Sequence, residues 1–506
     1  QALEANTTAN SNTAVGYKSL EANTTATQNT AVGALALDAT TTSSNNTAVG
    51  YSAMTDANGA VDSVAVGSEA LANVTTGDYN VGVGFQALKT ITTSGNCVAV
   101  GYQALENNTS GNNTAVGSNA LQSNTTGGDN TAVGLYSLYQ NTEGFSNTAF
   151  GKSALESCTT GDYNVAMGHG ALDAVQTGNR NTALGTFALT SNTGSYNVAV
   201  GMYALNQNTN GQFNVGVGYQ ALDANTSGEY NVAIGYEALK TNTTSNGNTA
   251  VGHYALRLNT GAKNVAMGTN AGAVISTGIQ NTAVGYNALD DCTTGSENTA
   301  IGEQALTAVT TGGANTAVGR LALQLCTGSH NTAVGRESCR DNTTGNYNTM
   351  VGRSAAENMT TGSNNTCLGA NAGRYSDPFA LTSQDNRVVI GDGSVSNAYI
   401  TVDWTIVSDE RDKVDFAEVP HGLDFVNKLK PKSFWRRKER GSDEKQGPQH
   451  YGFVAQDIIA LEGDNPVIID NEQEEKLKYT ESHLTPVLVK AIQELSARVE
   501  ELESRQ

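Results

Sequence analysis

Asn12-Thr13-Ala14-Val15-Gly16, followed by Tyr17, is the unit from which most of this chain is built. The same five residues return at 46–50 and 281–285, and a variant with Leu in place of Val stands at 181–185. The glycine that closes the unit occurs 22 times from Gly16 to Gly369, at seventeen intervals of 17 residues and four of 16. A period this strict identifies a repeat architecture.

The repeat length selects the type of coil. Seventeen residues are too few for a helical-hairpin repeat or a propeller blade, and they suit one coil of a β-solenoid. Residues 12–17 alternate with the two-residue period of a strand. A second short strand is expected over the following Ala-Leu, as at Ala104-Leu105, before an Asn-Thr-Thr-Gly turn. Because no proline interrupts residues 16–369, stacked strands are favoured. The sequence thus predicts a mainly β fold, a parallel β-solenoid shaft of about 22 coils over residues 1–370.

Stacked coils place like residues above one another, which predicts an Asn ladder, a Val ladder and a Leu ladder along the axis. A single thin rod buries little apolar area with Ala, Val and Leu, and ordering its many Gly and Asn residues is costly. We therefore expect one chain to lack a sufficient interior and to associate with others, which also protects strand edges. This reasoning does not count the chains.

Composition excludes several classes of function. The 506 residues carry a net charge of −20, which argues against a nucleic-acid partner or an anionic membrane patch. No apolar run is long enough for membrane insertion. The cysteines form no CxxC pair and no cluster with His, so we expect no metal site, no cofactor and no disulfide framework, but thiols at small-residue positions. They are Cys97, Cys158, Cys292, Cys326, Cys339 and Cys367.

The 17-residue period becomes irregular over residues 371–407, which we interpret as a transition neck. Residues 386–391 look like one last coil, and residues 399–407 alternate as a strand with bulkier side chains that would pack a neck or cap. At the other end, Gln1-Ala2-Leu3 reads as the middle of a repeat. We therefore expect an upstream virion or cell anchor that is missing from this chain.

Residues 408–506 form a separate small domain by composition, with 15 Lys/Arg and 21 Asp/Glu. Its last helix carries a heptad seam of Leu488, Ile492, Leu495, Val499 and Leu502. Either Thr480 or Ser482 is expected to cap this helix, with Pro486 in its first turn. A coiled coil and an amphipathic helix packed on its own domain remain equal alternatives.

Two resemblances add to this reading. The repeats resemble the heads of trimeric autotransporter adhesins and the repeat shafts of phage tail fibres, which implies a left-handed β-roll and a homotrimer. Residues 408–413 (Ser-Asp-Glu-Arg-Asp-Lys), 451–457 (Tyr-Gly-Phe-Val-Ala-Gln-Asp) and the 484–495 helix resemble the endosialidase-type intramolecular chaperone of phage tailspikes and fibres. That family trimerises, registers the upstream β-structure and then cleaves itself off. The resemblance implies a scissile bond between Val407 and Ser408, with Ser408 as nucleophile and Lys413 as general base.

The chemistry of these residues is compatible with such a serine–lysine protease acting in cis only. A serine hydroxyl needs a base to remove its proton, and a lysine can serve if it becomes neutral. Arg411 would favour the neutral lysine by like-charge repulsion, whereas Asp409 or Asp412 would oppose it. The basic stretch 430–440 is interpreted as a solvated or trimer-contacting face rather than a nucleic-acid site. The family resemblance would place it among the contacts with the client.

The favoured function is attachment of a virion tail fibre, or of another extracellular surface appendage, to a host cell-surface glycan or protein receptor. A bacterial adhesin with the same assembly domain is the alternative. A glycan-degrading enzyme is less favoured because acids such as Asp162 and Glu229 stand alone. Side chains after the closing glycines form either an aromatic stripe for sugars or contacts between coils. They include Tyr17, Tyr51, Phe85, Tyr102 and Tyr219. The receptor-binding residues remain unknown.

Overall fold

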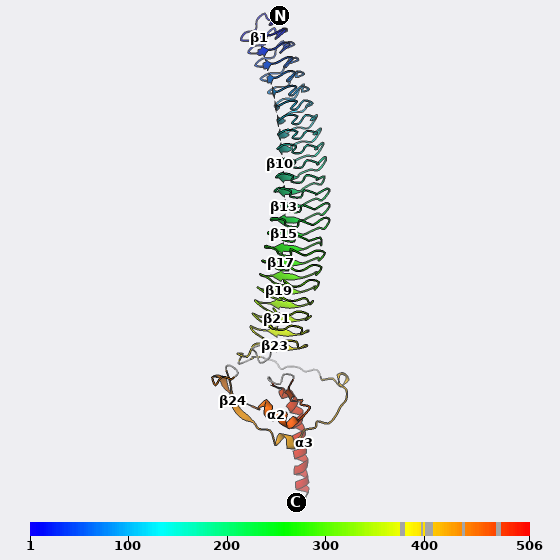
Figure 1. Cartoon of the computed structure of the whole chain (residues 1–506), viewed down its shortest axis with the longest axis vertical. Helices are drawn as coiled ribbons and strands as arrows, with labels where there is room; N and C mark the ends of the chain where they lie inside the picture. The colour runs from blue at the N-terminus through cyan, green and yellow to red at the C-terminus, as the bar shows by residue number, and fades with distance from the viewer. Residues whose placement is uncertain (375–379, 396–397, 400–407, 438–440, 472–476, 506) are drawn as a thin grey trace. The chain divides into compact units, whose positions relative to one another are not determined.

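A computed structural model describes residues 1–374, 380–395, 398–399, 408–437, 441–471 and 477–505 (Figure 1). Its contacts divide the described chain into a solenoid that continues to Ile390 and a C-terminal unit that begins at Gly391. Each unit is described by itself below.

The solenoid contains one short strand in every coil, and neighbouring strands pair in parallel (Figure 1). The register is in step from coil to coil, so that Ala14 faces Ala31 and Ala183 faces Ala199 across a shortened repeat. The strands of this 23-stranded sheet are β1 (Thr13–Val15), β2 (Thr30–Val32), β3 (Thr47–Val49), β4 (Val64–Val66), β5 (Val81–Val83), β6 (Val98–Val100), β7 (Thr114–Val116), β8 (Thr131–Val133), β9 (Thr148–Phe150), β10 (Val165–Met167), β11 (Thr182–Leu184), β12 (Val198–Val200), β13 (Val215–Val217), β14 (Val232–Ile234), β15 (Thr249–Val251), β16 (Val265–Met267), β17 (Thr282–Val284), β18 (Thr299–Ile301), β19 (Thr316–Val318), β20 (Thr332–Val334), β21 (Thr349–Val351), β22 (Thr366–Leu368) and β23 (Val388–Ile390).

The parallel β-solenoid predicted from the period is confirmed, and β23 is the additional last coil expected at residues 386–391. The expected strand over residues 399–407 falls largely outside the described residues. The left-handed sense and the association of three chains stay predictions.

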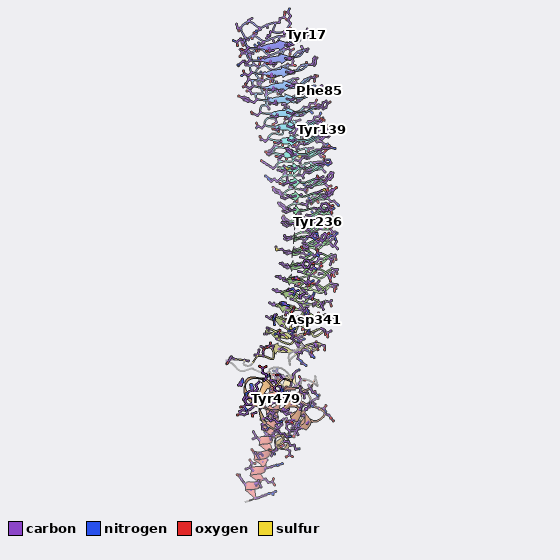
Figure 2. The ribbon with its side chains drawn as sticks, turned by 60° about the vertical axis from the view of Figure 1, so that its left-hand side comes forward. Tyr17, Phe85, Tyr139, Tyr236, Asp341 and Tyr479 are labelled. Carbon is purple, nitrogen blue, oxygen red and sulfur yellow. The ribbon has the colours of Figure 1, made fainter. Side chains whose placement is uncertain are left out.

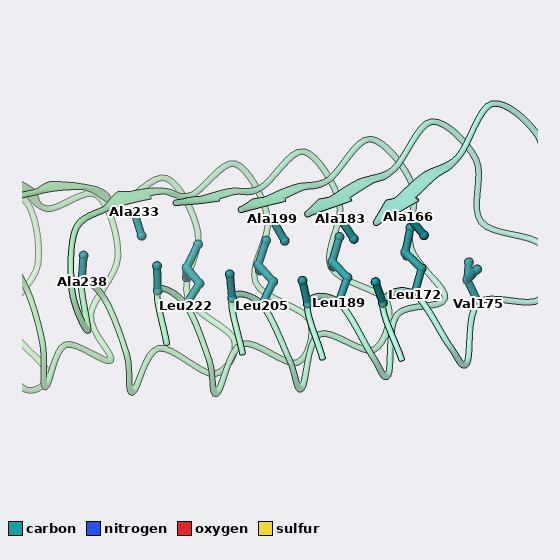
Figure 3. Packing of buried hydrophobic residues seen from close by; sticks show 14 of the residues in the cluster. Ala166, Leu172, Val175, Ala183, Leu189, Ala199, Leu205, Leu222, Ala233 and Ala238 are labelled. Carbon is teal, nitrogen blue, oxygen red and sulfur yellow. The ribbon is translucent and has the colours of Figure 1, made fainter. Parts of the chain in front are cut away.

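The interior of the solenoid is closed within a single chain. In a typical coil, the strand residue Ala199 and the turn residues Ala204 and Leu205 are fully buried. The same positions form parallel columns along the axis (Figure 3). The expectation that one chain lacks its own interior is therefore wrong, because each coil turns its small apolar residues inward against the next coil. The predicted Val ladder is also present, as from Val100 to Val116, and it lies on the exposed outer face.

The Ala-Leu segment does not form the second strand that was expected. Ala104-Leu105 lies in a turn, and both Gln103 and Leu105 have left-handed backbone angles, with φ near 52° and 53°. A non-glycine residue in this region costs about 1–2 kcal/mol. Complete burial of a Leu side chain contributes about 1.5–3 kcal/mol, which offsets the cost at Leu105 itself. Leu105 thus adopts a tight turn conformation that places its side chain in the interior of the solenoid.

The predicted Asn ladder is confirmed, and most of its bonds go to the backbone. Asn298 donates its backbone N–H to Asn281 Oδ1 (3.0 Å) and its Nδ2 to the Gly312 carbonyl (2.9 Å). Its own Oδ1 accepts the backbone N–H of Asn315 (3.1 Å). Each amide therefore satisfies buried backbone groups of the neighbouring coils, which would otherwise remain unpaired.

A second inner column lies three residues after the buried Leu. Asn124 Nδ2 donates to Asn108 Oδ1 and Asn141 Nδ2 to Asn124 Oδ1, both at 2.6 Å. Cys158 takes the next place and ends this run, so that Asn141 Oδ1 has no hydrogen-bond partner in the described part of the chain. All six cysteines are buried in the solenoid, as expected for thiols at small inner positions. Burial raises the pKa of Cys158 to about 12 and that of Cys292 and Cys326 to about 11.

The C-terminal unit mixes short helices with two small antiparallel sheets. Its elements are the 3-10 turn η1 (Glu410–Asp412), α1 (Leu423–Val426), β24 (Lys432–Arg437), β25 (Lys445–Gly452), α2 (Ala455–Glu462), β26 (Ile469–Asp470), β27 (Lys478–Tyr479) and α3 (Glu481–Ser504). Strand β24 pairs with β25 and β26 with β27. The core joins α1, α2, β26 and α3 through Phe425, Ile458, Ile469, Leu484 and Val487. The expected small α+β domain is confirmed.

Helix α3 presents two different faces. Leu484, Val487 and Ala491 are buried in the core of the unit. The heptad positions lie on the exposed side, where Ile492 is 64% and Leu495 50% exposed. One face of α3 therefore packs on its own domain, whereas the heptad positions on the other face remain available for a coiled coil.

The predicted start of this helix needs two corrections. Thr480 is the N-cap residue, but its side chain makes no capping hydrogen bond. Pro486 lies inside the helix, beyond the first turn where it was expected.

We expect Asn298→Ala to weaken the solenoid locally, because it leaves the Asn315 N–H and the Gly312 carbonyl buried without partners. The cost is about 2–4 kcal/mol, visible as faster amide hydrogen exchange over residues 312–318. Thr299→Val is the matched control, since valine occupies this strand position at Val165. Unchanged exchange in Asn298→Ala would contradict the role of the ladder.

Thiol chemistry tests the inner columns. At about pH 8, thiols with raised pKa values hold little thiolate, so iodoacetamide should leave Cys158, Cys292 and Cys326 unmodified in the folded protein and label them after denaturation. Mass spectrometry of tryptic peptides reads the result. Thr244→Cys, at an exposed turn position, is a control that should be labelled in the folded state. Labelling of the native inner cysteines would refute their burial.

The seam of α3 is tested with Ile492→Asp combined with Leu495→Asp. Because both side chains are exposed in one chain, the C-terminal unit should keep its fold while the chain loses its expected trimeric state in light scattering. Ser496→Asp, at an exposed position beside the seam, should leave the assembly intact. A trimer that survives the double substitution would show that the seam does not hold the chains together.

Candidate functional site

The segment that begins at Ser408 folds back on itself through η1 (Glu410–Asp412). The Asp409 side chain starts this turn by accepting the backbone N–H of Arg411 (2.9 Å). The turn returns Lys413 to the start of the segment, where its Nζ lies 2.6 Å from Ser408 Oγ and 3.4 Å from the Ser408 carbonyl oxygen. The structure thus brings the expected nucleophile and the expected base into direct contact.

The two supporting residues named from the sequence bind each other. Arg411 Nη2 lies 2.6 Å from Asp409 Oδ2, and its Nε lies 3.0 Å from Oδ1. The Arg411 hydrogen bonds hold the pKa of Asp409 below its ordinary value. The positive charge of Arg411 and the negative charge of Asp409, expected to act on Lys413 in opposite directions, are therefore joined in one exposed pair.

This geometry allows proton transfer between Ser408 and Lys413. A separation of 2.6 Å is within the reach of a general base and its nucleophile. The lysine ammonium donates to the hydroxyl in this arrangement, so it has to lose a proton before it can accept one from Ser408. Val407, on the other side of the expected scissile bond, lies outside the described residues.

Helix α3 holds the chain that follows the site, which the sequence did not reveal. Lys490 Nζ donates to the Val419 carbonyl (2.6 Å), and Glu494 accepts the backbone N–H of Leu423 (2.7 Å). Gly422 leaves room for this carboxylate, because a Cβ there would lie 2.3 Å from Glu494 Oε1. In sequence, Lys490 and Glu494 look like ordinary polar positions of a seam helix, so no local signal marks these contacts across 71 residues.

The basic stretch at 430–440 lies largely on the β24–β25 ribbon, whose β24 residues are all exposed. Lys445 Nζ stands 3.9 Å from the Trp435 ring centroid. Lys432 pairs with Asp457 (2.9 Å) and lowers the pKa of that carboxyl. The exposed apolar rings and internal ion pairs fit a face for protein contacts, and that role stays a prediction.

On the solenoid, some of the aromatic side chains after the closing glycines stack between coils, whereas Tyr17 and Tyr51 are exposed and are followed in the column by Ala34 and Ser68. Phe85 lies 5.4 Å from Tyr102, and Tyr219 5.3 Å from Tyr236, with nearly parallel rings. Figure 2 marks where Phe85 and Tyr236 lie along the solenoid. Packing between coils thus accounts for these pairs, since stacked rings cover each other's faces. Asp162 Oδ1, one of the isolated acids, accepts the backbone N–H of Phe145 (3.0 Å) and so joins neighbouring coils.

Within the described ranges, no group of three or more His, Cys, Asp or Glu side chains is arranged to hold a metal ion. In the same part of the chain, no helix combines the length and apolar character needed to cross a membrane.

Comparison with known proteins identifies the C-terminal segment. Residues 408–466 match the family Peptidase_S74, described as the chaperone of endosialidase. No curated protein and no solved structure matches the chain. The matched segment begins at Ser408 and includes η1, α1, the β24–β25 ribbon and α2. The chain therefore carries a C-terminal endosialidase-chaperone domain behind a long parallel β-solenoid.

Proposed function

We propose that this chain is part of a trimeric attachment fibre whose C-terminal domain assembles the shaft and then cleaves itself off between Val407 and Ser408. The observation that carries the proposal is the Ser408–Lys413 contact of 2.6 Å at the first residue of the matched chaperone segment. Domains of this family act in trimers. The solenoid immediately upstream is the structure that such a domain would assemble.

The shaft has a physical need for an assembly domain. Its coils are nearly identical, so two chains displaced by one whole coil would retain almost every like-to-like contact. Chains joined at one end cannot adopt these displaced registers. The exposed seam of α3 offers an apolar surface for that joining.

The proposed cleavage uses no separate substrate. Ser408 Oγ attacks the carbonyl carbon of Val407 while Lys413, once neutral, accepts the hydroxyl proton. The Val407–Ser408 C–N bond breaks, and the α-amino nitrogen of Ser408 takes a proton as it leaves. Water then hydrolyses the resulting ester, which yields a carboxylate at Val407 and restores the Ser408 hydroxyl. Because both reacting groups belong to one chain, their proximity supplies much of the rate.

Release of the domain would make assembly one-way. Once the chains are registered and the clamp has left, the shaft would persist because unfolding is slow and the route back is lost. A long exposed shaft suits attachment to a cell surface. A phage fibre is the favoured setting, and a bacterial surface adhesin with the same assembly domain remains the second candidate.

The cleavage is tested by expressing the chain with single substitutions and comparing denaturing gels. Ser408→Ala removes the nucleophile, and Lys413→Arg keeps the charge but cannot accept the proton. Both should remain full-length, whereas the wild type should release a 99-residue fragment that begins at Ser408. Glu410→Ala, at an exposed position of the same turn, should cleave normally. A wild-type chain that stays uncut, or a Ser408→Ala chain that is cut, would overturn the proposed cleavage.

A further inference from the structure

The residue immediately before each ladder Asn forms an outer column along one side of the sheet. From the tenth to the sixteenth coil, this column reads Tyr163, Arg180, Tyr196, Phe213, Tyr230, Gly247 and Lys263. The backbone N–H of each residue bonds a carbonyl of the preceding coil, as from Tyr230 to Gln212 and from Gly247 to Glu229. Successive members of the column are therefore direct neighbours.

The side chains of the column stack until the run stops at Tyr230. Arg180 lies between the rings of Tyr163 and Tyr196, 5.4 Å from each centroid. Tyr196 stacks on Phe213 (5.0 Å, 14°), and Phe213 stacks on Tyr230 (5.1 Å, 3°). Tyr196 and Phe213 thus each lie between two stacked neighbours. Tyr230 has one covered face.

The next residue in the column, Gly247, has no side chain. A Cβ on Gly247 would meet a single neighbour, Lys263 Cγ, at 3.9 Å. Tyr230 is 59% exposed, against 42% for Phe213 one coil earlier. Tyr347, which is followed by Asn364, is 63% exposed, so what distinguishes Tyr230 is that the coil of Gly247 has no side chain to cover its ring.

The backbone does not require glycine at this place. Gly247 has φ near 70°, and its neighbours Tyr230 and Lys263 adopt φ near 58° and 60° with full side chains. Elsewhere the same column carries Asn, Tyr and Phe at similar angles, as at Asn112 and Phe213. The missing side chain therefore changes the surface and leaves the fold as it is.

The gap has the height of one ring. Strands stand about 4.8 Å apart, so the coils of Tyr230 and Lys263 are separated by roughly 10 Å. A ring placed about 3.5–4 Å from Tyr230 would be in van der Waals contact and would lie level with Gly247. Lys263 Cγ lies 3.9 Å from the Cβ position of Gly247, so the Lys263 side chain borders the gap. Glu229 and Asn246 precede Tyr230 and Gly247 in their coils, and Asn246 Oδ1 accepts the backbone N–H of Glu229 (2.8 Å).

We propose that the gap at Gly247 binds one pyranose ring of a cell-surface glycan, which would stack on the ring of Tyr230. A pyranose combines an apolar C–H face with hydroxyl groups around its edge, which matches an open aromatic face bordered by hydrogen-bonding groups. The inference rests on the proposed attachment function and assigns that function a ligand class and a place. It locates the site away from the column that follows the closing glycines.

The test fills the gap. Gly247→Tyr extends the stack by one ring at a backbone angle that tyrosine already adopts in this column, so the solenoid should fold normally. The full chain and its variants are titrated on an array of immobilised neutral, N-acetylated and acidic oligosaccharides. We expect the wild type to bind at least one class, and both Gly247→Tyr and Tyr230→Ala to weaken that binding by about tenfold or more.

The matched control is Asn364→Tyr. Tyr347 ends another stack on His330 (4.9 Å, 2°), but Asn364 occupies the following place, so this variant should bind like the wild type. Wild-type binding that survives both Gly247→Tyr and Tyr230→Ala overturns the inference, as does a wild type that binds no saccharide. Adhesion of the full chain to intact cells is measured in parallel. If adhesion persists in either case, only the glycan site is refuted; if adhesion is absent as well, the attachment function fails with it.

Discussion

The solenoid depends on hydrogen bonds that run from each coil to the same positions of the next. The Asn ladder shows the constraint most clearly, because the side chain of Asn298 serves backbone groups of Asn315 and Gly312 rather than of its own strand. No coil satisfies its buried polar groups alone. Stability is therefore a property of the stack, to which each coil adds an interface with its neighbours.

The contacts between coils also explain why the repeat tolerates the loss of a residue in its surface turn but keeps its closing glycine. A residue is lost four times without disturbing the register, because the loss falls in a surface turn while the strands still pair in step, as at β11 and β12. The closing glycine permits no such variation. At Gly235, with φ near 137°, a Cβ would lie 2.3 Å from the carbonyl oxygen of Gly252 in the next coil. Close approach of the two backbones keeps the closing glycine at the strand ends from Gly16 to Gly352.

Uniform coils also shape the proposed function. Nothing within a shaft of interchangeable coils distinguishes the correct register from a displaced one, and in the proposed function the C-terminal domain would set the register from one end. Departures from uniformity then become informative. Cys158 interrupts an amide column inside the solenoid, and Gly247 interrupts an aromatic column outside it. The first leaves an unpaired oxygen in the interior, whereas the second opens a ring face to solvent.

Sequence alone determined the parallel stacking, the coil length, the Asn ladder and the first residue of the segment that matches the chaperone family. The reason for the first three is that a strict period forces like residues together whatever the details of the turn. Tertiary structure alone decided where each side chain goes within a coil. Ala104-Leu105 reads as a strand by composition, yet burial of leucine outweighs its backbone preference and makes a turn. Contacts between Ser408 and Lys413, and from α3 to Val419 and Leu423, depend on how a segment folds back in space, and residue spacing does not encode that path.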